Sequence, residues 1–196
     1  MNICVFGAAS TDIEQQYIED GEKLGYKLAK AGHNLVFGGG DNGLMGAVAR
    51  GIKKGGGKII SVVPKMFKGD TVETLYKQYD EVYYTKDMSA RQAKMIELSD
   101  GFVITPGGIG TYEEFFVVLD LKQLEVIRKP IAVLNSHGYF HALEAMMHIG
   151  FEEKFMRENA LSLYKCFGGH EMRALIKYLE TPEEDDNIPV SGYKYG

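Results

Sequence analysis

The sequence lacks the features that mark several specialised protein classes. Its 196 residues contain no tryptophan and only two cysteines, Cys4 and Cys166. Neither cysteine belongs to a CxxC pair, so neither a disulfide framework nor a thiolate zinc site is expected. No apolar run approaches the roughly 20 residues of a membrane span. The first residues run directly into a strand pattern without the charged leader of a signal peptide, so we expect a cytoplasmic protein with no membrane partner.

An excess of positive charge is also missing. Lysine and arginine number 22 against 27 aspartates and glutamates, which gives a formal net charge of −5. There is no basic tail or stripe, so nucleic acid is not an expected partner. Residues 181–196 are acidic and rich in turn formers, and we expect them to form a loose tail after a single domain at 1–180.

Glycine, by contrast, is abundant, with 24 residues where an average composition of about 7% would give roughly 14. Two clusters stand out, at 38–43 and at 107–110. Each follows a short apolar run and precedes a helical pattern, so each is expected to turn the chain from a strand into a helix.

Strand and helix patterns alternate along the chain. Strands are expected at 3–6, 35–37, 58–63, 81–84, 101–105, 130–134 and 161–164. Helices are expected after a Thr11–Glu14 capping box, and at 44–54, 87–98, 111–126, 140–149, 152–158 and 171–180, with an irregular loop at 65–79. Several strands are apolar without alternation, which indicates burial on both faces of a parallel sheet. The pattern predicts an α/β fold, a Rossmann-like doubly wound sheet of about seven mostly parallel strands with helices on both faces.

The segment from Ile104 to Glu114 carries the clearest functional signal. A buried strand, a glycine turn and a helix N-terminus follow one another without interruption. Backbone N–H groups and the helix dipole at such a turn favour an anion, and phosphate is the expected one. Its predicted ligands are Gly107, Gly108, Gly110 and Thr111.

Two charged side chains allow alternative interpretations. Arg91 shares a helix face with Met88, Gln92 and Met95, so it either extends past the methionines to water or binds an anion. Glu114 either completes a capping box three residues after a threonine or points inward as a catalytic carboxylate. The residues alone leave both questions open.

Other chemistries find less support. The segment Gly38–Gly43 fits GxGxxG, but it follows the second expected strand, and the next strand ends without an acidic residue for a ribose hydroxyl. Tight turns and close helix–strand packing explain most of these glycines, so NAD binding is not the expected function. His137 and His141 are four apart without an HExxH motif, and no GxSxG elbow is present. We expect no metal and no organic cofactor.

Three ordered motifs resemble the LOG family of cytokinin riboside 5′-monophosphate phosphoribohydrolases, often labelled "possible lysine decarboxylase". PGGxGTxxE is present at 106–114, GGGxxGLMG at 38–46, and MxxRKxxM at 88–95 with Gln92 in place of the lysine. The resemblance implies a Rossmann-like fold, a homodimer, Arg91 and Glu114 as the catalytic pair, and a phosphate site in the 107–111 loop. Met88, Gln92, Gly39 and Gly40, from the other two motifs, complete the predicted substrate site.

The implied reaction is hydrolysis of the N-glycosidic bond of a nucleoside 5′-monophosphate, AMP or an N6-substituted AMP. The alternative is a non-catalytic nucleotide-binding or carrier protein on the same fold. Departures at Gln92, at Asp120 and in the first strand's turn affect the expected base specificity more than the reaction. No lysine lies in a recognisable site for the pyridoxal phosphate that a decarboxylase would need. Apolar crowding on the helix after the 107–111 loop, together with Met146, Met147, Phe155 and Met156, also favours a homodimer.

Overall fold

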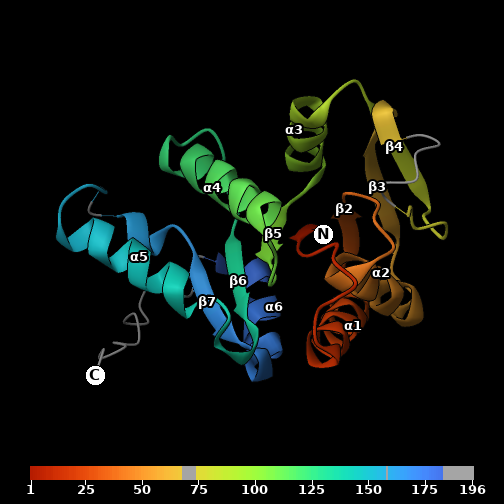
Figure 1. Ribbon diagram of the computed structural model, residues 1–196, viewed down its shortest axis with the longest axis horizontal. Coiled ribbons are helices and arrows are strands. Elements are labelled where there is room, and N and C mark those ends of the chain that lie inside the picture. Colours follow the sequence, from red (N-terminus) through yellow and green to blue (C-terminus); the bar gives the residue numbers. More distant parts are fainter. Residues whose placement is uncertain (68–73, 158, 183–196) are drawn as a thin grey trace.

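The computed structural model describes residues 1–67, 74–157 and 159–182 (Figure 1). The expected loose tail therefore lies almost entirely outside the described residues, as does the centre of the expected 65–79 loop. Seven strands form one sheet, and all their pairings are parallel rather than mostly parallel. They are β1 (Asn2–Phe6), β2 (Asn34–Phe37), β3 (Ile59–Pro64), β4 (Glu81–Thr85), β5 (Gly101–Ile104), β6 (Ile131–Asn135) and β7 (Lys165–Gly168).

The strand order is β4-β3-β2-β1-β5-β6-β7. The chain builds outward from β1 to β4, returns to the centre, and continues from β5 to β7 on the other side. The direction of winding thus reverses between β1 and β5. In open parallel sheets, ligands bind outside the carboxyl ends of the strands at such a switch point.

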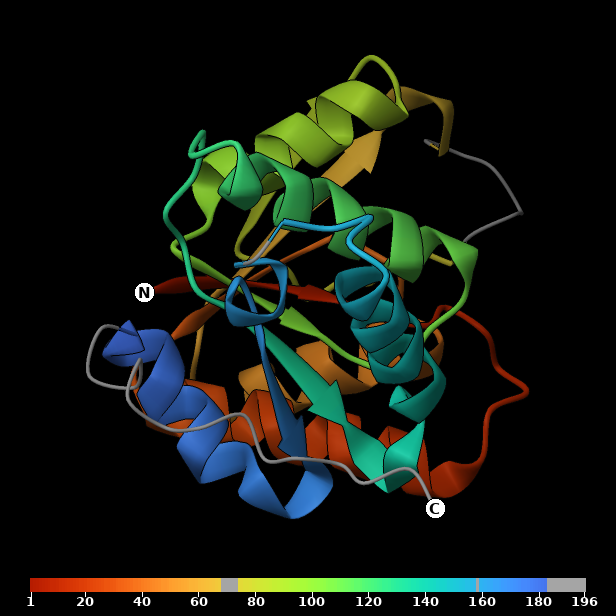
Figure 2. The ribbon, with the colours of Figure 1, turned by 90° about the vertical axis from the view of Figure 1, so that its left-hand side faces the viewer.

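Helices cover both faces, as expected. α1 (Gln15–Lys30), α2 (Gly43–Gly55) and α6 (Met172–Glu180) pack on one face, while α3 (Met88–Leu98), α4 (Ile109–Gln123) and α5 (His141–Glu152) pack on the other (Figures 1 and 2). Each face has its own apolar core, because alternate residues of the central strands point to opposite sides. In β1, Ile3 and Val5 join the α1–α2–α6 side, and Cys4 and Phe6 join the other. None of the described helices is long and apolar enough to cross a membrane.

Two of the expected elements after β6 are wrong. The segment expected as strand seven, 161–164, overlaps the end of a 3₁₀ turn at Ala160–Ser162, and the strand itself is β7, which begins four residues later at Lys165. The helix expected at 152–158 does not form, because α5 ends at Glu152 and Lys154 adopts a positive φ of 62°. Short apolar runs do not distinguish a strand from a buried turn, since both bury the same side chains.

Both expected capping boxes are also wrong. Glu14 is itself the N-cap of α1 and makes no side-chain capping bond, so the helix begins after Thr11 rather than at it. The N-cap of α4 is Gly108, which places Thr111 in the first turn and Glu114 in the second. Capping therefore does not account for the glutamate of the PGGxGTxxE motif.

Candidate functional site

The site is built on the loops that follow β1 and β5, which lie side by side at the switch point. The Ala8 N–H donates to the Pro106 carbonyl at 3.0 Å, and the Thr105 hydroxyl donates to the Phe6 carbonyl at 2.8 Å. Thr105 is fully buried, so its hydrogen bond is protected from water and fixes one loop against the other.

The carbonyl groups of the glycine loop are all engaged by the protein. After Pro106, the Gly107 carbonyl accepts the Tyr139 hydroxyl at 2.6 Å, and the Gly108 carbonyl accepts the Tyr112 N–H at 3.1 Å. The first N–H groups of an α-helix have no partner within the helix, and Gly108 offers no side chain to cap them. The loop thus presents donors to a ligand, as an anion site requires.

Gly108 and Gly110 are not glycines for internal steric reasons. A β-carbon at either position would meet no atom within 4 Å, and neither residue has a positive φ. Gly108 and Gly110 are also exposed. The space beside Gly108 and Gly110 is therefore not needed by other residues of the protein. Glycine at such positions allows a ligand to approach the backbone closely.

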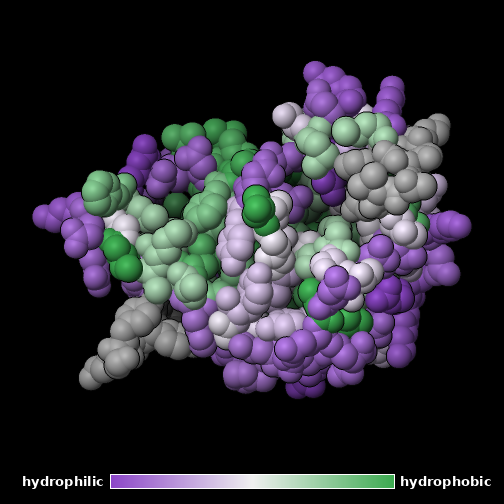
Figure 3. Space-filling view, in the orientation of Figure 1, coloured by the Kyte–Doolittle hydropathy of each residue, from purple (hydrophilic) through white to green (hydrophobic). Residues whose placement is uncertain are grey.

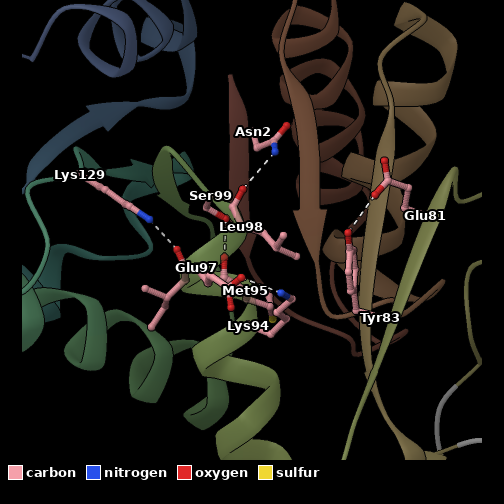
Figure 4. A network of polar contacts seen from close by, with 10 residues as sticks. Asn2, Glu81, Tyr83, Lys94, Met95, Glu97, Leu98, Ser99 and Lys129 are labelled. Atoms are coloured by element: carbon pink, nitrogen blue, oxygen red, sulfur yellow. Dashed lines mark hydrogen bonds and ion pairs between the residues drawn. The ribbon is translucent and has the colours of Figure 1, made fainter.

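Helix α3, which carries Arg91, is held firmly at both ends. Asp87 caps its start by accepting the Ala90 N–H at 2.7 Å. At its end, Asn2 donates to the Leu98 carbonyl at 3.1 Å, Lys129 to the Ile96 carbonyl at 2.7 Å and Ser99 to the Met95 carbonyl at 2.7 Å (Figure 4). The last carbonyls of a helix otherwise lack partners, so these side chains fix the position of α3 relative to β1 and β5.

Arg91 is buried and does not extend to water. Its side chain is only 8% exposed, and its Nε donates to the Val62 carbonyl at 3.3 Å. One guanidinium nitrogen, Nη1, lies 4.0 Å from the Met88 sulfur. Both of these partners are neutral, so they orient the guanidinium without cancelling its charge. Buried arginine is rare, so extension to water no longer explains this side chain, and anion binding stays the prediction for it.

The adjacent glutamates of α4 point in different directions. Glu113 is exposed, and its Oε1 accepts a hydrogen bond from Gln92 Nε2 at 3.3 Å. Glu114 is half-buried and lies close enough to β1 for its charge to act on Cys4. Burial raises the pKa of the Cys4 thiol well above its ordinary value, with the Glu114 carboxylate as the second cause. Glu114 is thus the less exposed of the two carboxylates, and its inward direction stays a prediction.

A pocket between α3 and α4 brings four of the ten predicted site residues together, Met88, Arg91, Gln92 and Glu114. Its lining consists of Met88, Ser89, Arg91, Gln92, Met95, Glu113 and Glu114. The predicted phosphate ligands do not line this pocket but lie at the start of α4 and in the loop before it. From Gly110 to Glu114 is about one helical turn, roughly 6 Å along the axis. One small molecule can therefore reach both the helix N-terminus and the carboxylate.

The remaining predicted residues, Gly39 and Gly40, lie in the turn after β2. Gly39 has a φ of 87°, and its carbonyl accepts the Tyr76 N–H at 2.8 Å. Gly40 forms an isolated antiparallel bridge with Leu75. Their backbones are thus occupied by the segment before β4, while the neighbouring Gly38 faces Arg91.

Comparison with known proteins agrees with this architecture. The family described as "possible lysine decarboxylase" matches residues 45–179. Probable cytokinin riboside 5′-monophosphate phosphoribohydrolase LOGL6 of Oryza sativa subsp. japonica is 38% identical over 191 residues, which are 95% of this chain and 74% of the relative. Cytokinin riboside 5′-monophosphate phosphoribohydrolase LOG4 of Arabidopsis thaliana is 36% identical, over 91% of this chain and 81% of its own.

The chain belongs to the LOG family. Solved structures extend the comparison of the fold alone. The molybdenum cofactor carrier protein of Chlamydomonas reinhardtii superposes with a TM-score of 0.67 at 23% identity, covering 92% of this chain and 98% of its own. The molybdenum cofactor binding protein of Rippkaea orientalis gives a TM-score of 0.65 at 18% identity, with coverages of 92% and 96%.

Sequence reasoning missed three residues that shape the site of this LOG-family protein. Gly38 provides the space for the Arg91 guanidinium, Thr105 fixes the β5 loop, and Tyr139 holds Gly107. Thr105 and Gly38 could have been found, since each directly follows a strand at the carboxyl edge. Tyr139 could not, because its contact joins residues 32 positions apart.

No group of three or more His, Cys, Asp and Glu side chains within 1–67, 74–157 and 159–182 could hold a metal ion in this LOG-family protein. His137, the first of the two histidines that are four positions apart, lies with its Nε2 atom 3.2 Å from the Asp20 carboxylate. The pocket lining includes no lysine among the described residues, so it offers no amine for a pyridoxal Schiff base.

Proposed function

We propose that this protein hydrolyses the N-glycosidic bond of a nucleoside 5′-monophosphate, AMP or an N6-substituted AMP, to free base and ribose 5-phosphate. The observation that carries the proposal is the meeting of buried Arg91 and half-buried Glu114 in one pocket, one helical turn from the open N-terminus of α4. The relatives named as cytokinin riboside 5′-monophosphate phosphoribohydrolases support the same reaction.

In this proposal the phosphate binds the N–H groups at the start of α4 and the Thr111 hydroxyl, with the glycines leaving room for its oxygens. The bond from the ribose C1′ to the base breaks, and the base takes the electron pair and a proton. Water adds its oxygen to C1′. The developing oxocarbenium ion is cationic, and the Glu114 carboxylate stabilises it and orients the water.

Arg91 binds and orients the anionic nucleotide from the opposite wall of the pocket. Met88, which is 46% exposed at the start of α3, offers an apolar surface to the base. Gln92 stands where the family has lysine, so this wall carries one positive charge fewer and contacts the ligand through an amide. Gly39 and Gly40 shape the turn that places Gly38 against the Arg91 guanidinium. No cofactor takes part in these steps, and the protein is proposed to act as a cytoplasmic homodimer.

Incubation with AMP, followed by chromatography for adenine and ribose 5-phosphate in equal amounts, tests the proposal. An N6-substituted AMP and adenosine, run in parallel, measure the contributions of the base substituent and of the phosphate. We expect release from both nucleotides and little from adenosine. Tight AMP binding without release of adenine would instead support the non-catalytic carrier.

A further inference from the structure

Tyr139 occupies an unusual position beside the glycine loop. It comes from the turn after β6, far from the PGGxGTxxE motif in sequence, yet its hydroxyl reaches the Gly107 carbonyl at 2.6 Å. Burial raises the pKa of the Tyr112 hydroxyl on α4, and the nearby Tyr139 side chain adds to this rise. The Tyr139 hydroxyl thus links the glycine loop to the β6 turn and lies near the side chain of Tyr112.

The β6 turn itself is held rigidly. His137 has a left-handed backbone with a φ of 54°, a conformation that persists only when its surroundings enforce it. Its Nε2 lies 3.2 Å from the Asp20 carboxylate of α1, and the ring of Tyr17 packs edge-on against both His137 and Tyr139. The Tyr139 hydroxyl is therefore presented to the loop from a fixed support.

The hydrogen bond has a definite effect on the peptide that joins Gly107 and Gly108. In a planar trans peptide, the carbonyl and the following N–H point in opposite directions. Because Tyr139 holds the Gly107 carbonyl on its own side, the Gly108 N–H must point away from Tyr139. Gly108 carries no side chain and is exposed, so nothing of its own covers this donor.

We propose that Tyr139 is a positioning residue that orients the Gly107–Gly108 peptide so that the Gly108 N–H binds the 5′-phosphate. This inference rests on the proposed function, because it takes the loop as the phosphate site. Tyr139 does not touch the reacting bond, so its loss weakens phosphate binding and leaves the chemical step intact. A net hydrogen bond contributes about 0.5–1.5 kcal/mol, which corresponds to an affinity change of roughly two- to tenfold.

Tyr139→Phe removes the hydroxyl and keeps the ring. Tyr17→Phe is the matched control, since it also loses one hydroxyl and keeps the ring that packs on Tyr139. Dissociation constants for AMP, ribose 5-phosphate and adenosine are measured by calorimetry for both variants and the wild type, together with KM, kcat and the melting temperature.

We expect Tyr139→Phe to raise the dissociation constants of AMP and ribose 5-phosphate roughly two- to tenfold, with the adenosine affinity and kcat nearly unchanged and the melting temperature lower by about 2–4 °C. Tyr17→Phe should match the wild type. Unchanged AMP affinity in Tyr139→Phe, an equal loss for adenosine, or a wild type that binds neither phosphate ligand would overturn the inference. A wild type that binds AMP but releases no adenine would sink the proposed function alone, because the affinities would still decide the role of Tyr139.

Discussion

The guanidinium of Arg91 fills the space that a β-carbon would occupy at Gly38. These residues are 53 positions apart, on α3 and in the turn after β2. The contact explains why the first glycine of the GGG motif is needed, although its φ is not positive. Because Gly38 has no side chain, the Arg91 guanidinium can approach the backbone closely while its Nε donates to the Val62 carbonyl.

Gly38→Ala should therefore inactivate the protein by displacing Arg91. We expect adenine release from AMP to fall about 10²-fold, comparable with the loss of a catalytic electrostatic contact. Arg91→Ala alone should cost at least as much, with a melting temperature close to that of the wild type. In the double variant, Gly38→Ala should cause little further loss of activity beyond that of Arg91→Ala, because both substitutions remove the same interaction. If the activity losses of the two single variants multiply in the double variant, Gly38 does not act through Arg91.

Glu114→Gln should bind AMP but release almost no adenine. The amide keeps the shape of the side chain and removes the negative charge that the oxocarbenium ion requires, so turnover should fall about 10²-fold or more. Glu113→Gln is the control, since Glu113 is exposed and bonds Gln92 rather than facing the sheet. Similar activity in the two variants, whether high or low, would mean that the carboxylate is wrongly assigned.

Gly110→Ala should fold normally and bind nucleotide poorly. The structure leaves a β-carbon there without a neighbour within 4 Å, and alanine is the better helix former, so the melting temperature should stay level or rise. If the phosphate lies against this backbone, KM for AMP should increase at least tenfold, and ribose 5-phosphate should lose affinity in parallel. A KM like that of the wild type would remove the loop from the proposed phosphate site.

The protein should be a homodimer through the surface of α4 and α5. Only some of the apolar residues on which this expectation was based can contact a second subunit. The protein's own core contains four of them, Phe115, Val118, Leu119 and Met147. Hydrophobic atoms still gather over α4 and α5, while the lower side near α1 is mostly hydrophilic (Figure 3). Exposed apolar residues on this surface include Phe116, Met146, Ile149 and Phe155, the last being 89% exposed, and surfaces of this kind mark protein interfaces.

Light scattering at micromolar concentration should give about twice the 21.8 kDa of the chain for the wild type. Ile149→Glu should lower the mass toward one chain, because an unpaired charge in an apolar interface is costly. Met66→Glu, at a position 62% exposed outside this surface, serves as the control. A wild type of a single chain's mass would rule out the dimer.

His33 should make stability depend on pH. Burial lowers the pKa of His33 from its ordinary value of 6.5, and the Met1 ammonium group adds to the effect, while Glu180 at 3.0 Å opposes it. As the pH falls below about 6.5, the unfolded state therefore binds more protons at His33 than the folded state does. The free energy of unfolding is highest above this pH and decreases as the pH falls further. His33→Gln should flatten the decline in chemical-denaturation midpoints between pH 7 and 5, whereas exposed His170→Gln should not. If the denaturation midpoint of His33→Gln depends on pH as steeply as that of the wild type, groups other than His33 cause the decline.

The sequence by itself determined the parallel sheet, because unalternating apolar strands can be buried only between two helical layers. It also located the glycine loop after β5 and the helices that carry Arg91 and Glu114, since these are local patterns with fixed periodicities. The sequence-based expectations were wrong where two different local structures are compatible with the same sequence pattern. The Thr111–Glu114 spacing allows a capping box, but the helix begins two residues before Thr111, at Ile109, because Gly108 ends the turn after β5.

Only the tertiary structure decided which distant residues complete the site. The winding of the chain reverses between β1 and β5, and that reversal brings the loops after both strands together. The burial of Arg91 against Gly38 and the hold of Tyr139 on Gly107 depend on how helices and turns pack on the finished sheet. No local periodicity encodes these contacts, because they join segments whose positions relative to one another exist only once the sheet has formed.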